Sequence, residues 1–516
     1  MAERLGGPGR PTARDLAGSA RFGGRAEPAS HWPARALGPE ETAIFDDGSI
    51  NALRRREPAA SAYRLMTPDQ RFVGACLVIL AAAAFAAAPL TAVTAANALI
   101  CGYFIVVIAF RLYLAALQFG KAPALTPEPL ADADLPSVTV LLPLYNEAEA
   151  LPMLIAAIDK IDYPADRLDV KVLLEADDFS TIATARRLKL DERFHVVKLP
   201  ATEPRTKPKA CNFGLFQAAS DLIVIYDAED MPEPDQLRKA AAVFAQADPD
   251  VACVQARLNY YNAKENWLTR LFALEYALWF DSLLPALERI RAPIPLGGTS
   301  NIFRTGVLRA VGGWDPYNVT EDADVGMRLA RFGYRTAMVD STTFEEANSR
   351  LGNWIRQRSR WMKGYMQTWL VHMREPGRFL KAAGPMGFVS THLFLAGTVF
   401  SALVTPILIV GAAVWALSGD ASAPRWLTAL NVFTLIAGAI TFVGLAMIAP
   451  LKRGWTDLCP YALLAPIYWA LMTVAAYKAL LQLFTRPHFW EKTDHILSAQ
   501  AAEARVQTLK SLAPLK

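Results

Sequence analysis

The sequence predicts an α/β domain with a Rossmann-like sheet, inserted between transmembrane helices. Two observations support this prediction. The chain of 516 residues is 53% hydrophobic and 20% charged, which is too apolar for an ordinary soluble protein and too charged for a chain that lies wholly in a membrane. Long apolar runs also flank a central region, 135–375, in which short apolar runs alternate with helical patterns. Buried strands that alternate with helices form a mostly parallel sheet with helices on both faces.

Composition excludes several partners and sites. The formal net charge is only +4, so no nucleic acid is expected as a partner. The five cysteines are scattered without a CxxC pair, which argues against a disulfide framework and a zinc site and fits a reducing, cytosolic compartment. Residues 1–68 are rich in Gly, Pro, Ala and Arg and show no periodicity, so we expect a disordered N-terminal tail.

Apolar runs on both sides of the central region predict membrane spans. Phe72–Leu90 and Ala95–Leu117 are each long enough to cross a hydrocarbon core, which takes roughly 20 apolar residues. They predict a transmembrane hairpin over 69–120, set in a lipid bilayer. Over 376–485 we expect an interfacial helix and further transmembrane helices, in the runs 386–417, 427–450 and 459–484.

The number of spans conflicts with the character of the C-terminal tail, 486–516. The basic pair Lys452 and Arg453 predicts a cytoplasmic loop, and the tail also looks cytoplasmic, but five spans would put it outside. Either one run is broken into an interfacial or re-entrant piece, at Pro466 or Pro406, or the tail faces outward. The segment HFWEKTDH in this tail has no evident chemistry, and an interfacial anchor is its simplest interpretation.

Acidic residues follow each of three predicted strands in the central region. The strands lie in SVTVLLPLYNE (137–147), VKVLLEADD (170–178) and DLIVIYDAED (221–230), and the acids are Glu147, Asp177, Asp178, Asp227 and Glu229. Ligands bind at the carboxyl ends of parallel strands. One such acid is more often a turn or a helix cap, but several at one edge repel each other unless a cation or a ligand lies there. Oxygen ligands of this kind suit Mg²⁺ or Mn²⁺, and such an ion commonly holds a diphosphate.

Four motifs, in order, give the chain a family resemblance over about residues 60–495. They are the acid pair at 177–178, DAE at 227–229, TED at 320–322 and QRSRW at 357–361. Together with the flanking apolar runs, they resemble the membrane-embedded family 2 glycosyltransferases of the cellulose synthase and hyaluronan synthase type. The resemblance implies a cytosolic catalytic domain of the GT-A type and exopolysaccharide synthesis at a bacterial inner membrane.

The resemblance also implies a donor site for a nucleotide sugar. Asp177 or Asp178 would accept hydrogen bonds from the uracil or the ribose, and Glu147 would lie at the same edge of the sheet. Lys209, in KPKACN, matches a lysine that meets the diphosphate, where a mobile positive charge is useful. A lysine exposed to solvent is the alternative.

The DAE motif matches the metal-binding acids of the family, with one departure. Asp227 and Glu229 would hold Mg²⁺ or Mn²⁺, but the second position is Glu where the family has Asp. Whether Glu229 or the next residue, Asp230, reaches the ion stays open.

In the TED motif, the resemblance makes Asp322 the general base that deprotonates the acceptor hydroxyl, next to Glu321 and Thr320. An apolar stripe beyond the motif predicts a helix, so the alternative is that these acids only favour the helix dipole. The loop PLGGTSNIFR would bring the backbone at Gly298 close to the acceptor sugar.

QRSRW lies in a segment of alternating cationic and aromatic residues. By resemblance Arg360 would stabilise the leaving nucleoside diphosphate, Gln357 would hydrogen-bond nearby, and Trp361 would stack on the acceptor sugar. For Arg356, Arg358 and Lys363 we expect an ordinary role as anchors at the membrane interface.

The activity implied is inverting, processive transfer of a sugar, with UDP-glucose favoured as donor, to a growing polysaccharide that passes across the membrane to an export partner in the periplasm. Two alternatives remain. One is a non-processive transferase that adds one sugar to a lipid. The other is a transporter, although the chain contains no GxxxxGK[ST] phosphate loop.

Overall fold

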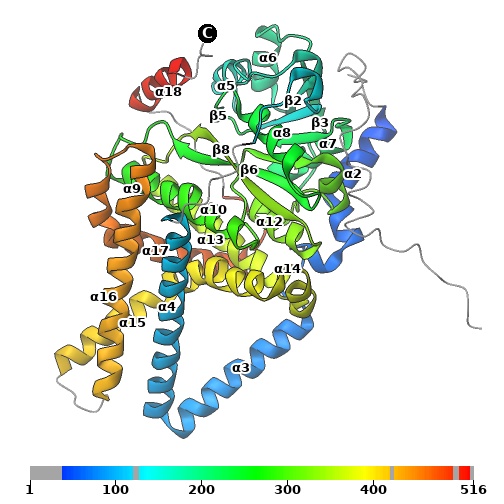
Figure 1. Ribbon diagram of the computed structural model, residues 1–516. Helices are drawn as coiled ribbons and strands as arrows, with labels where there is room; N and C mark the ends of the chain where they lie inside the picture. The colour runs from blue at the N-terminus through cyan, green and yellow to red at the C-terminus, as the bar shows by residue number, and fades with distance from the viewer. Residues whose placement is uncertain (1–37, 120–126, 419–423, 492–498, 512–516) are drawn as a thin grey trace, which may run out of the picture.

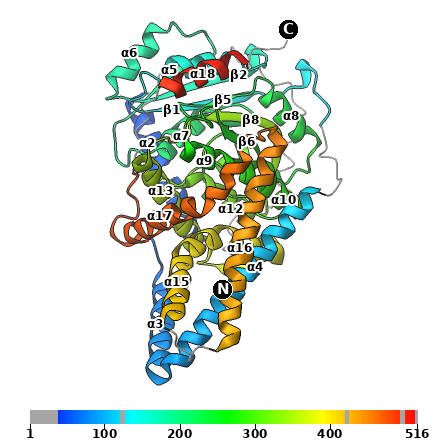
Figure 2. The same cartoon turned by 90° about the vertical axis from the view of Figure 1, so that its left-hand side faces the viewer.

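Figure 1 shows the computed structural model, which describes residues 38–119, 127–418, 424–491 and 499–511. An α/β domain lies at one end of the molecule, and long helices extend from its lower side. A view at 90° shows the same two-part arrangement (Figure 2). The predicted class, a Rossmann-like domain between apolar helices, is therefore confirmed.

A sheet of eight strands forms the centre of the domain as described. The strands are β1 (Val138–Leu144), β2 (Leu168–Glu175), β3 (Phe194–Leu199), β4 (Leu222–Ile225), β5 (Met231–Pro232), β6 (Val251–Tyr260), β7 (Asn301–Arg304) and β8 (Arg335–Glu345). Their order is β3-β2-β1-β4-β7-β6-β8-β5. The first four are parallel, but β7 runs antiparallel to both β4 and β6. The sheet is thus more mixed than the sequence predicted, while β1, β2 and β4 confirm the three predicted strands.

Alternating side chains of the central strands build two cores, because successive residues of a strand point to opposite faces. Val140 and Leu142 belong to one core, with α5 (Leu151–Ile158), α6 (Phe179–Arg187) and α8 (Gln236–Gln246). Leu141 belongs to the other core, which includes residues of α7 (Lys207–Gln217), α9 (Trp267–Leu278) and α12 (Glu321–Arg331). Helices therefore cover both faces, as predicted.

The N-terminal segment is ordered where the structure describes it. Helix α2 (Pro39–Arg56) packs against α7, and Leu53 is buried. The side-chain amide of Asn212 donates to the carbonyl of Ser49 at 2.9 Å. The prediction of a disordered tail over 1–68 is therefore wrong for residues 39–66, and residues 1–37 lie outside the described part. Too few apolar residues face α7 to give a visible helical period.

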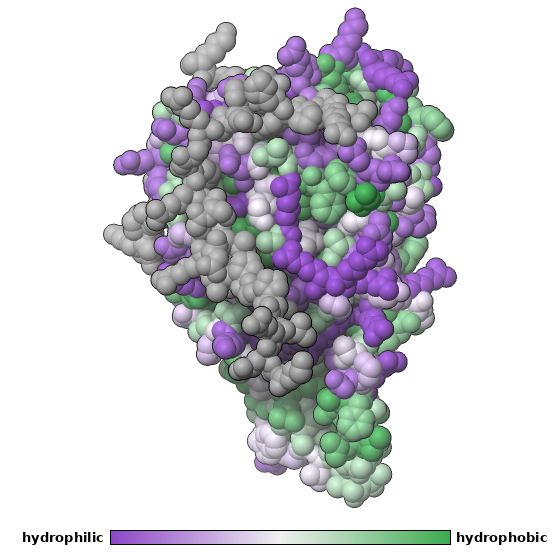
Figure 3. Space-filling model, turned by 90° about the vertical axis from the view of Figure 1, so that its right-hand side faces the viewer, coloured by the Kyte–Doolittle hydropathy of each residue, from purple (hydrophilic) through white to green (hydrophobic). Residues whose placement is uncertain are grey.

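Five helices in the described residues are long and apolar enough to cross a membrane. They span Pro68–Ala87, Pro89–Gln118, Pro376–Ala413, Arg425–Arg453 and Cys459–Thr485. Helices α3 (Pro68–Ala87), α4 (Pro89–Phe119), α15 (Gly397–Ser418) and α16 (Arg425–Ile448) extend away from the α/β domain in both views. Figure 3 shows hydrophobic side chains at this lower end of the molecule. Helix α14 (Pro376–Thr391) lies across the lower side of the domain, where the sequence predicted an interfacial helix.

Helix α17 (Ala465–Thr485) differs in direction from the other four candidate spans. It lies alongside α13 (Leu351–His372) beneath the domain and does not extend downward with the other four. Near its start, Tyr468 accepts a hydrogen bond from Arg358 at 2.8 Å, and just after its end the carbonyl of Arg486 accepts one from Lys363 at 3.2 Å. Both ends of α17 therefore lie beside the α/β domain. The helix begins next to Pro466, whereas Pro406 lies inside α15 without ending it.

The basic loop after α16 also lies on the side of the domain. Arg453 forms a bidentate ion pair with Asp281, at 2.6 and 2.7 Å, and the ammonium of Lys452 donates to the carbonyl of Asp281 at 2.7 Å. The loop therefore lies next to the α/β domain, and its cytoplasmic side stays a prediction.

Candidate active site

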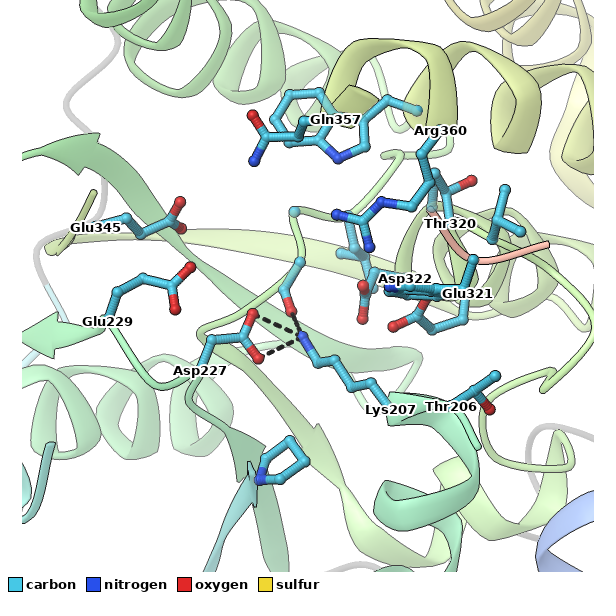
Figure 4. A pocket seen from close by; sticks show the side chains of 18 of the residues that line it. Thr206, Lys207, Asp227, Glu229, Thr320, Glu321, Asp322, Glu345, Gln357 and Arg360 are labelled. Carbon is cyan, nitrogen blue, oxygen red and sulfur yellow. Dashed lines mark hydrogen bonds and ion pairs between the residues drawn. The ribbon is translucent and has the colours of Figure 1, made fainter. Parts of the chain in front are cut away.

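A cavity of about 430 Å³ opens where the carboxyl ends of β1, β2 and β4 meet α12 and α13. Figure 4 shows acids and bases from distant parts of the chain that face this space. The predicted site residues that line it are Glu147, Asp227, Glu229, Gly298, Thr320, Glu321, Asp322, Gln357, Arg360 and Trp361. Asp177, Asp178 and Lys209 do not line it.

Asp227 lines the cavity and follows the end of β4 after one intervening residue, Tyr226. The ammonium of Lys207 binds both of its carboxylate oxygens, at 2.7 and 2.8 Å, and also donates to the carbonyl of Gly298 (Figure 4). Burial alone would lower the pKa of Lys207, but the carboxylates of Asp227, Asp322 and Glu321 raise it well above its usual value. Lys207 is thus held as a cation among carboxylates.

The structure separates the two acids that follow Asp227. Glu229 lines the cavity. Asp230 is fully buried, and one of its carboxylate oxygens accepts hydrogen bonds from the backbone N–H of Asp227, at 2.5 Å, and from the hydroxyl of Thr299. Burial and the charge of Asp227 raise the pKa of Asp230 well above its usual value. Asp230 therefore shapes the turn, and Glu229 is the acid that accompanies Asp227 in the cavity.

Asp322 lies across Gly298 from Asp227. A β-carbon on Gly298 would lie 3.8 Å from a carboxylate oxygen of Asp322 and 4.0 Å from one of Asp227. Glycine at this position therefore leaves the space between the two carboxylates open. Asp322 and Glu321 begin α12, and burial, followed by the charge of Glu321, raises the pKa of Asp322 well above its usual value. A buried carboxyl with a raised pKa in a cavity is suited to proton transfer.

The start of α12 is held in place by α13. The carboxamide of Asn318 accepts from the backbone N–H of Thr320 at 3.0 Å and donates to the hydroxyl of Thr368 at 2.9 Å. Gln367 accepts from the backbone N–H of Val319 at 3.2 Å. Gly364 allows this close approach, because a β-carbon there would lie 2.2 Å from the hydroxyl oxygen of Thr320.

Asp324, the third acid of this helix, has a different role. It is fully buried and binds Arg328 at 3.0 Å and His372 at 3.1 Å. It therefore fixes α12 to α13 inside the protein and does not face the cavity.

Helix α13 brings the QRSRW motif to the opposite wall. Gln357 lines the cavity and accepts a hydrogen bond from Asn348 at 2.9 Å. Burial lowers the pKa of Arg360, although the carboxylates of Glu321 and Asp227 act in the opposite direction. Trp361 stacks on Tyr276, with 6.2 Å between the ring centroids.

Two cations of α13 are not membrane anchors, contrary to the expectation from the sequence. Arg358 is buried, forms a bidentate ion pair with Glu275 and lies over the ring of Trp361 at 4.6 Å. Lys363 is fully buried, and burial lowers its pKa to about 8. Both hold neighbouring segments in place, because their charges have specific partners inside the protein.

The acids that follow β2 do not enter the cavity. Asp178 caps α6: its carboxylate accepts from the backbone N–H of Thr181 at 3.1 Å and of Asn146 at 2.7 Å. Asp177 forms an ion pair with Arg205 at 2.6 Å. For Asp178 the role of helix cap, which the sequence left open as the alternative, is the one that the structure supports.

Lys209 is the clearest correction to the predicted donor site. Its ammonium is fully buried and donates to the carbonyls of Pro200 and Thr202, each at 2.8 Å. Lys207 faces the cavity in its place. Residues two apart on a helix point about 200° apart, so α7 can present only one of these lysines to the cavity.

Several residues of the site carried no motif in the sequence. Glu345 lines the cavity beside Glu229 (Figure 4), and it ends β8, so the rule that acids follow strands could have found it. Tyr145 and Arg205 also line the cavity, and Trp490 reaches it from beyond α17. Tyr145 lies in the predicted strand segment that contains Glu147, so the rule of strand ends could have found it. Nothing in the sequence near Arg205 or Trp490 marks them as neighbours of the DAE turn.

One side of the cavity is formed by aromatic residues and by the apolar helices. Tyr276, Trp279 and Trp361 line it together with Thr398 of α15 and Met472 of α17. The cavity is thus polar around Asp227 and aromatic toward the candidate membrane helices.

The C-terminal helix α18 (Ala499–Ser511) contacts the acid turn from outside the cavity. The guanidinium of its buried residue Arg505 donates to the carbonyl of Ala228 at 2.8 Å. The middle residue of the DAE turn is therefore fixed by a segment that lies far away in the sequence.

Comparison with known proteins identifies this region with a family. The model of the family described as "Glycosyl transferase family group 2" matches residues 222–481, about half of the chain. The match begins at β4 and includes the DAE turn, α12 and α13. Together with the mixed sheet, it confirms that the domain is of the GT-A type.

Sequence identity to two individual relatives is below 30%. The chain is 28% identical over 237 residues to "Probable glucomannan 4-beta-mannosyltransferase 10" of Arabidopsis thaliana, covering 44% of this chain and 43% of the relative. It is 27% identical over 241 residues to "Probable glycosyltransferase YdaM" of Bacillus subtilis (strain 168), covering 45% of this chain and 56% of the relative. The chain thus spans about half the length of the curated relatives that it matches. A solved structure of the mannosyltransferase PcManGT from Pyrobaculum calidifontis, in complex with GDP-Man and Mn²⁺, aligns with a TM-score of 0.47 and 22% identity, over 75% of this chain and 99% of that one.

Proposed function

The chain belongs to glycosyl transferase family group 2, and on that premise we propose that it is a processive, inverting hexosyltransferase. It would polymerise sugar from a nucleotide diphosphate sugar into an exopolysaccharide and pass the product across a bacterial inner membrane, with its α/β domain in the cytosol. The observation that carries this proposal is the pair Asp227 and Asp322 on either side of Gly298, in a cavity that also reaches the apolar helices.

The proposed reaction is a single displacement at the anomeric carbon. The acceptor hydroxyl transfers its proton to Asp322 while its oxygen attacks the anomeric carbon, and the bond from that carbon to the diphosphate oxygen breaks. The raised pKa of Asp322 makes its carboxylate a stronger base than an ordinary aspartate. Lys207 and Arg360 supply positive charge for the leaving diphosphate, where fixed cations stabilise developing charge most effectively.

The residues at Asp227 fit a divalent cation bound together with the donor. Asp227 and Glu229 offer hard oxygen ligands on one side of the cavity, which suits Mg²⁺ or Mn²⁺. Within the described residues, no group of three or more Asp, Glu, His or Cys side chains could hold a metal ion alone, so the diphosphate would complete the coordination. Such an ion would neutralise charge on the diphosphate when bound. Lys207 would then leave Asp227, because both cations need the same carboxylate oxygens.

Processivity is supported by the aromatic side of the cavity. A polymer that remains bound after each transfer needs a surface that holds sugar rings without fixing one residue, and aromatic faces provide this through their contact with apolar C–H groups. Trp361 and Tyr276 form such a surface, and Thr398 and Met472 continue the cavity toward α15 and α17. An export partner on the far side of the membrane remains a prediction from the sequence.

The donor sugar has two candidates. The family resemblance in the sequence favours UDP-glucose. The names of the plant relatives indicate a mannosyl donor, which would make GDP-mannose the donor here. Tyr145, Glu147 and Arg205 line the donor side of the cavity, and we propose that they contact the nucleoside.

The test is transfer by inverted membrane vesicles that contain the full chain, supplied with labelled UDP-glucose or labelled GDP-mannose, with and without EDTA. We expect a high-molecular-weight product from one of the two donors, lost with EDTA and with Asp322→Asn. Asp178→Asn is the matched control, because it makes the same chemical change outside the cavity. A single lipid-soluble glycoside would contradict processivity, and no product from either donor would contradict the proposed donor sites.

A further inference from the structure

A short segment after α17 crosses the catalytic region. We call residues 486–491, with the sequence RPHFWE, the C-terminal strap. The buried ammonium of Lys363 donates to the carbonyls of Arg486, at 3.2 Å, and of Phe489, at 2.8 Å. The side-chain amide of Gln367 donates to the carbonyl of Pro487 at 3.0 Å. Three hydrogen bonds from one helix therefore hold the strap along α13.

Two further contacts fix the strap to other elements. A ring nitrogen of His488 lies 2.9 Å from the carbonyl of Tyr317, just before the TED motif. Glu491 forms an ion pair with Lys478 of α17 at 2.6 Å and accepts a hydrogen bond from Gln482 at 3.1 Å. The strap is thus joined to α13, to the segment before α12 and to α17. A peripheral anchor would not need this set of inward contacts.

Trp490 is the residue of the strap that reaches the cavity. The guanidinium carbon of Arg360 lies 4.4 Å from the centroid of its ring, within the range of a cation–π interaction. The Nε of Arg360 is buried and has no hydrogen-bond partner among the described residues. The ring of Trp490 is therefore a direct contact of this guanidinium, which also lies in the field of Glu321 and Asp227.

The geometry points to Trp490 as a positioning residue for the transfer reaction. Its ring holds the guanidinium of Arg360 toward the place where the diphosphate leaves, and the hydrogen bonds of the strap hold the ring. This inference rests on the proposed function, because it gives Arg360 the role of stabilising the leaving group. An arginine fixed before the reaction loses less side-chain freedom and needs less reorganisation when charge develops on the diphosphate.

The test is a double-mutant cycle with Trp490→Ala and Arg360→Ala in the full chain, measured by donor turnover. We expect Trp490→Ala to lower kcat/KM about 10-fold when Arg360 is present and less than about 2-fold when Arg360 is already replaced, since residues that act through one contact are not additive. Trp490→Phe keeps a ring and should retain most of the activity, whereas Trp490→Leu keeps apolar volume without a ring and should not. Trp426→Ala, at an exposed tryptophan of α16, is the matched control.

Binding of UDP and GDP, with UMP and GMP as comparisons, separates this inference from the proposed function. Trp490→Ala should weaken diphosphate binding and leave monophosphate binding unchanged. If the wild-type chain binds a nucleoside diphosphate but transfers no sugar, the proposed function is wrong and the binding cycle still tests Trp490. Equal losses from Trp490→Ala in both Arg360 backgrounds, or equal activity of the Leu and Phe variants, would overturn the positioning role. Absence of diphosphate binding to the wild-type chain would overturn both.

Discussion

Asp178, after β2, and Asp322, at the start of α12, both belong to acidic motifs in the sequence. The structure shifts the pKa values of their carboxyl groups in opposite directions. Burial would raise the pKa of Asp178, but hydrogen bonds from Thr181 and Asn146 bring it below its usual value. At the start of α12, burial and the neighbouring Glu321 raise the pKa of Asp322 well above its usual value, and one of its carboxylate oxygens is buried without a hydrogen-bond partner among the described residues.

This difference separates an acid whose charge the protein satisfies from an acid whose charge it does not. The carboxylate of Asp178 is stabilised by backbone N–H groups, so the protein itself satisfies its charge. The carboxylate of Asp322 is left with a strong affinity for a proton in a cavity that can admit a hydroxyl group. The same residue type therefore caps a helix at one place, and at the other it has the properties that the proposed base requires.

The largest expected effect is the loss of the base. Asp322→Asn should lower sugar transfer by about 10³-fold, because general base catalysis contributes about 10²- to 10⁴-fold. The measurement is the initial rate of transfer at saturating donor. Asp178→Asn should stay within about 2-fold of the wild type, since asparagine also caps helices. Equal losses in the two variants would contradict the distinction drawn between these acids.

The next effect compares the two lysines of α7. Lys207→Met should weaken binding of the nucleoside diphosphate by about 10- to 100-fold, as expected for a lost charge-assisted hydrogen bond, with little change in thermal stability. Lys209→Met should leave binding of the nucleoside diphosphate nearly unchanged. It should lower the free energy of unfolding by about 1–3 kcal/mol, because it leaves the carbonyls of Pro200 and Thr202 without their donor. Calorimetric titration and denaturation measure the two quantities. A loss of affinity with Lys209→Met alone would restore Lys209 as the donor lysine.

A smaller effect concerns pH. Asp322 must be ionised to act as a base. Its raised pKa therefore places the acidic limb of the pH profile of kcat/KM at a higher pH than the pKa of an ordinary aspartate would. Glu321→Gln removes a negative charge that raises this pKa, so the limb should move to lower pH. The exposed Glu192→Gln is the control and should leave the limb in place. A shift to higher pH in Glu321→Gln would show that another group controls the limb.

The smallest effect tests the cap itself. Asp178→Ala should lower the free energy of unfolding by about 1 kcal/mol, whereas Asp178→Asn should change it little, because alanine cannot accept the N–H groups at the start of α6. Chemical denaturation of the two variants measures the difference. If donor binding fell with Asp178→Ala while stability did not, Asp178 would belong to the donor site after all.

The sequence by itself determined the fold class of this protein and most of the residues that line its candidate active site. The apolar runs located the candidate membrane helices, and the strands with acids at their ends located Asp227 and Glu229. Asp322, Gln357, Arg360 and Trp361 were implied by the family resemblance of four motifs that occur in order. The apolar runs and the acids at strand ends could be predicted because each depends on local periodicity or on a few adjacent residues.

Tertiary structure alone decided which neighbour of a motif faces the cavity. Lys207 and Lys209, or Glu229 and Asp230, differ only by their direction on a helix or a turn, and that direction depends on what packs against the element. Packing also ordered α2, which is too sparsely apolar to show a period. Trp490 reaches Arg360 only because α17 returns the chain to α13, and a contact between segments so far apart in the sequence leaves no trace in either one alone.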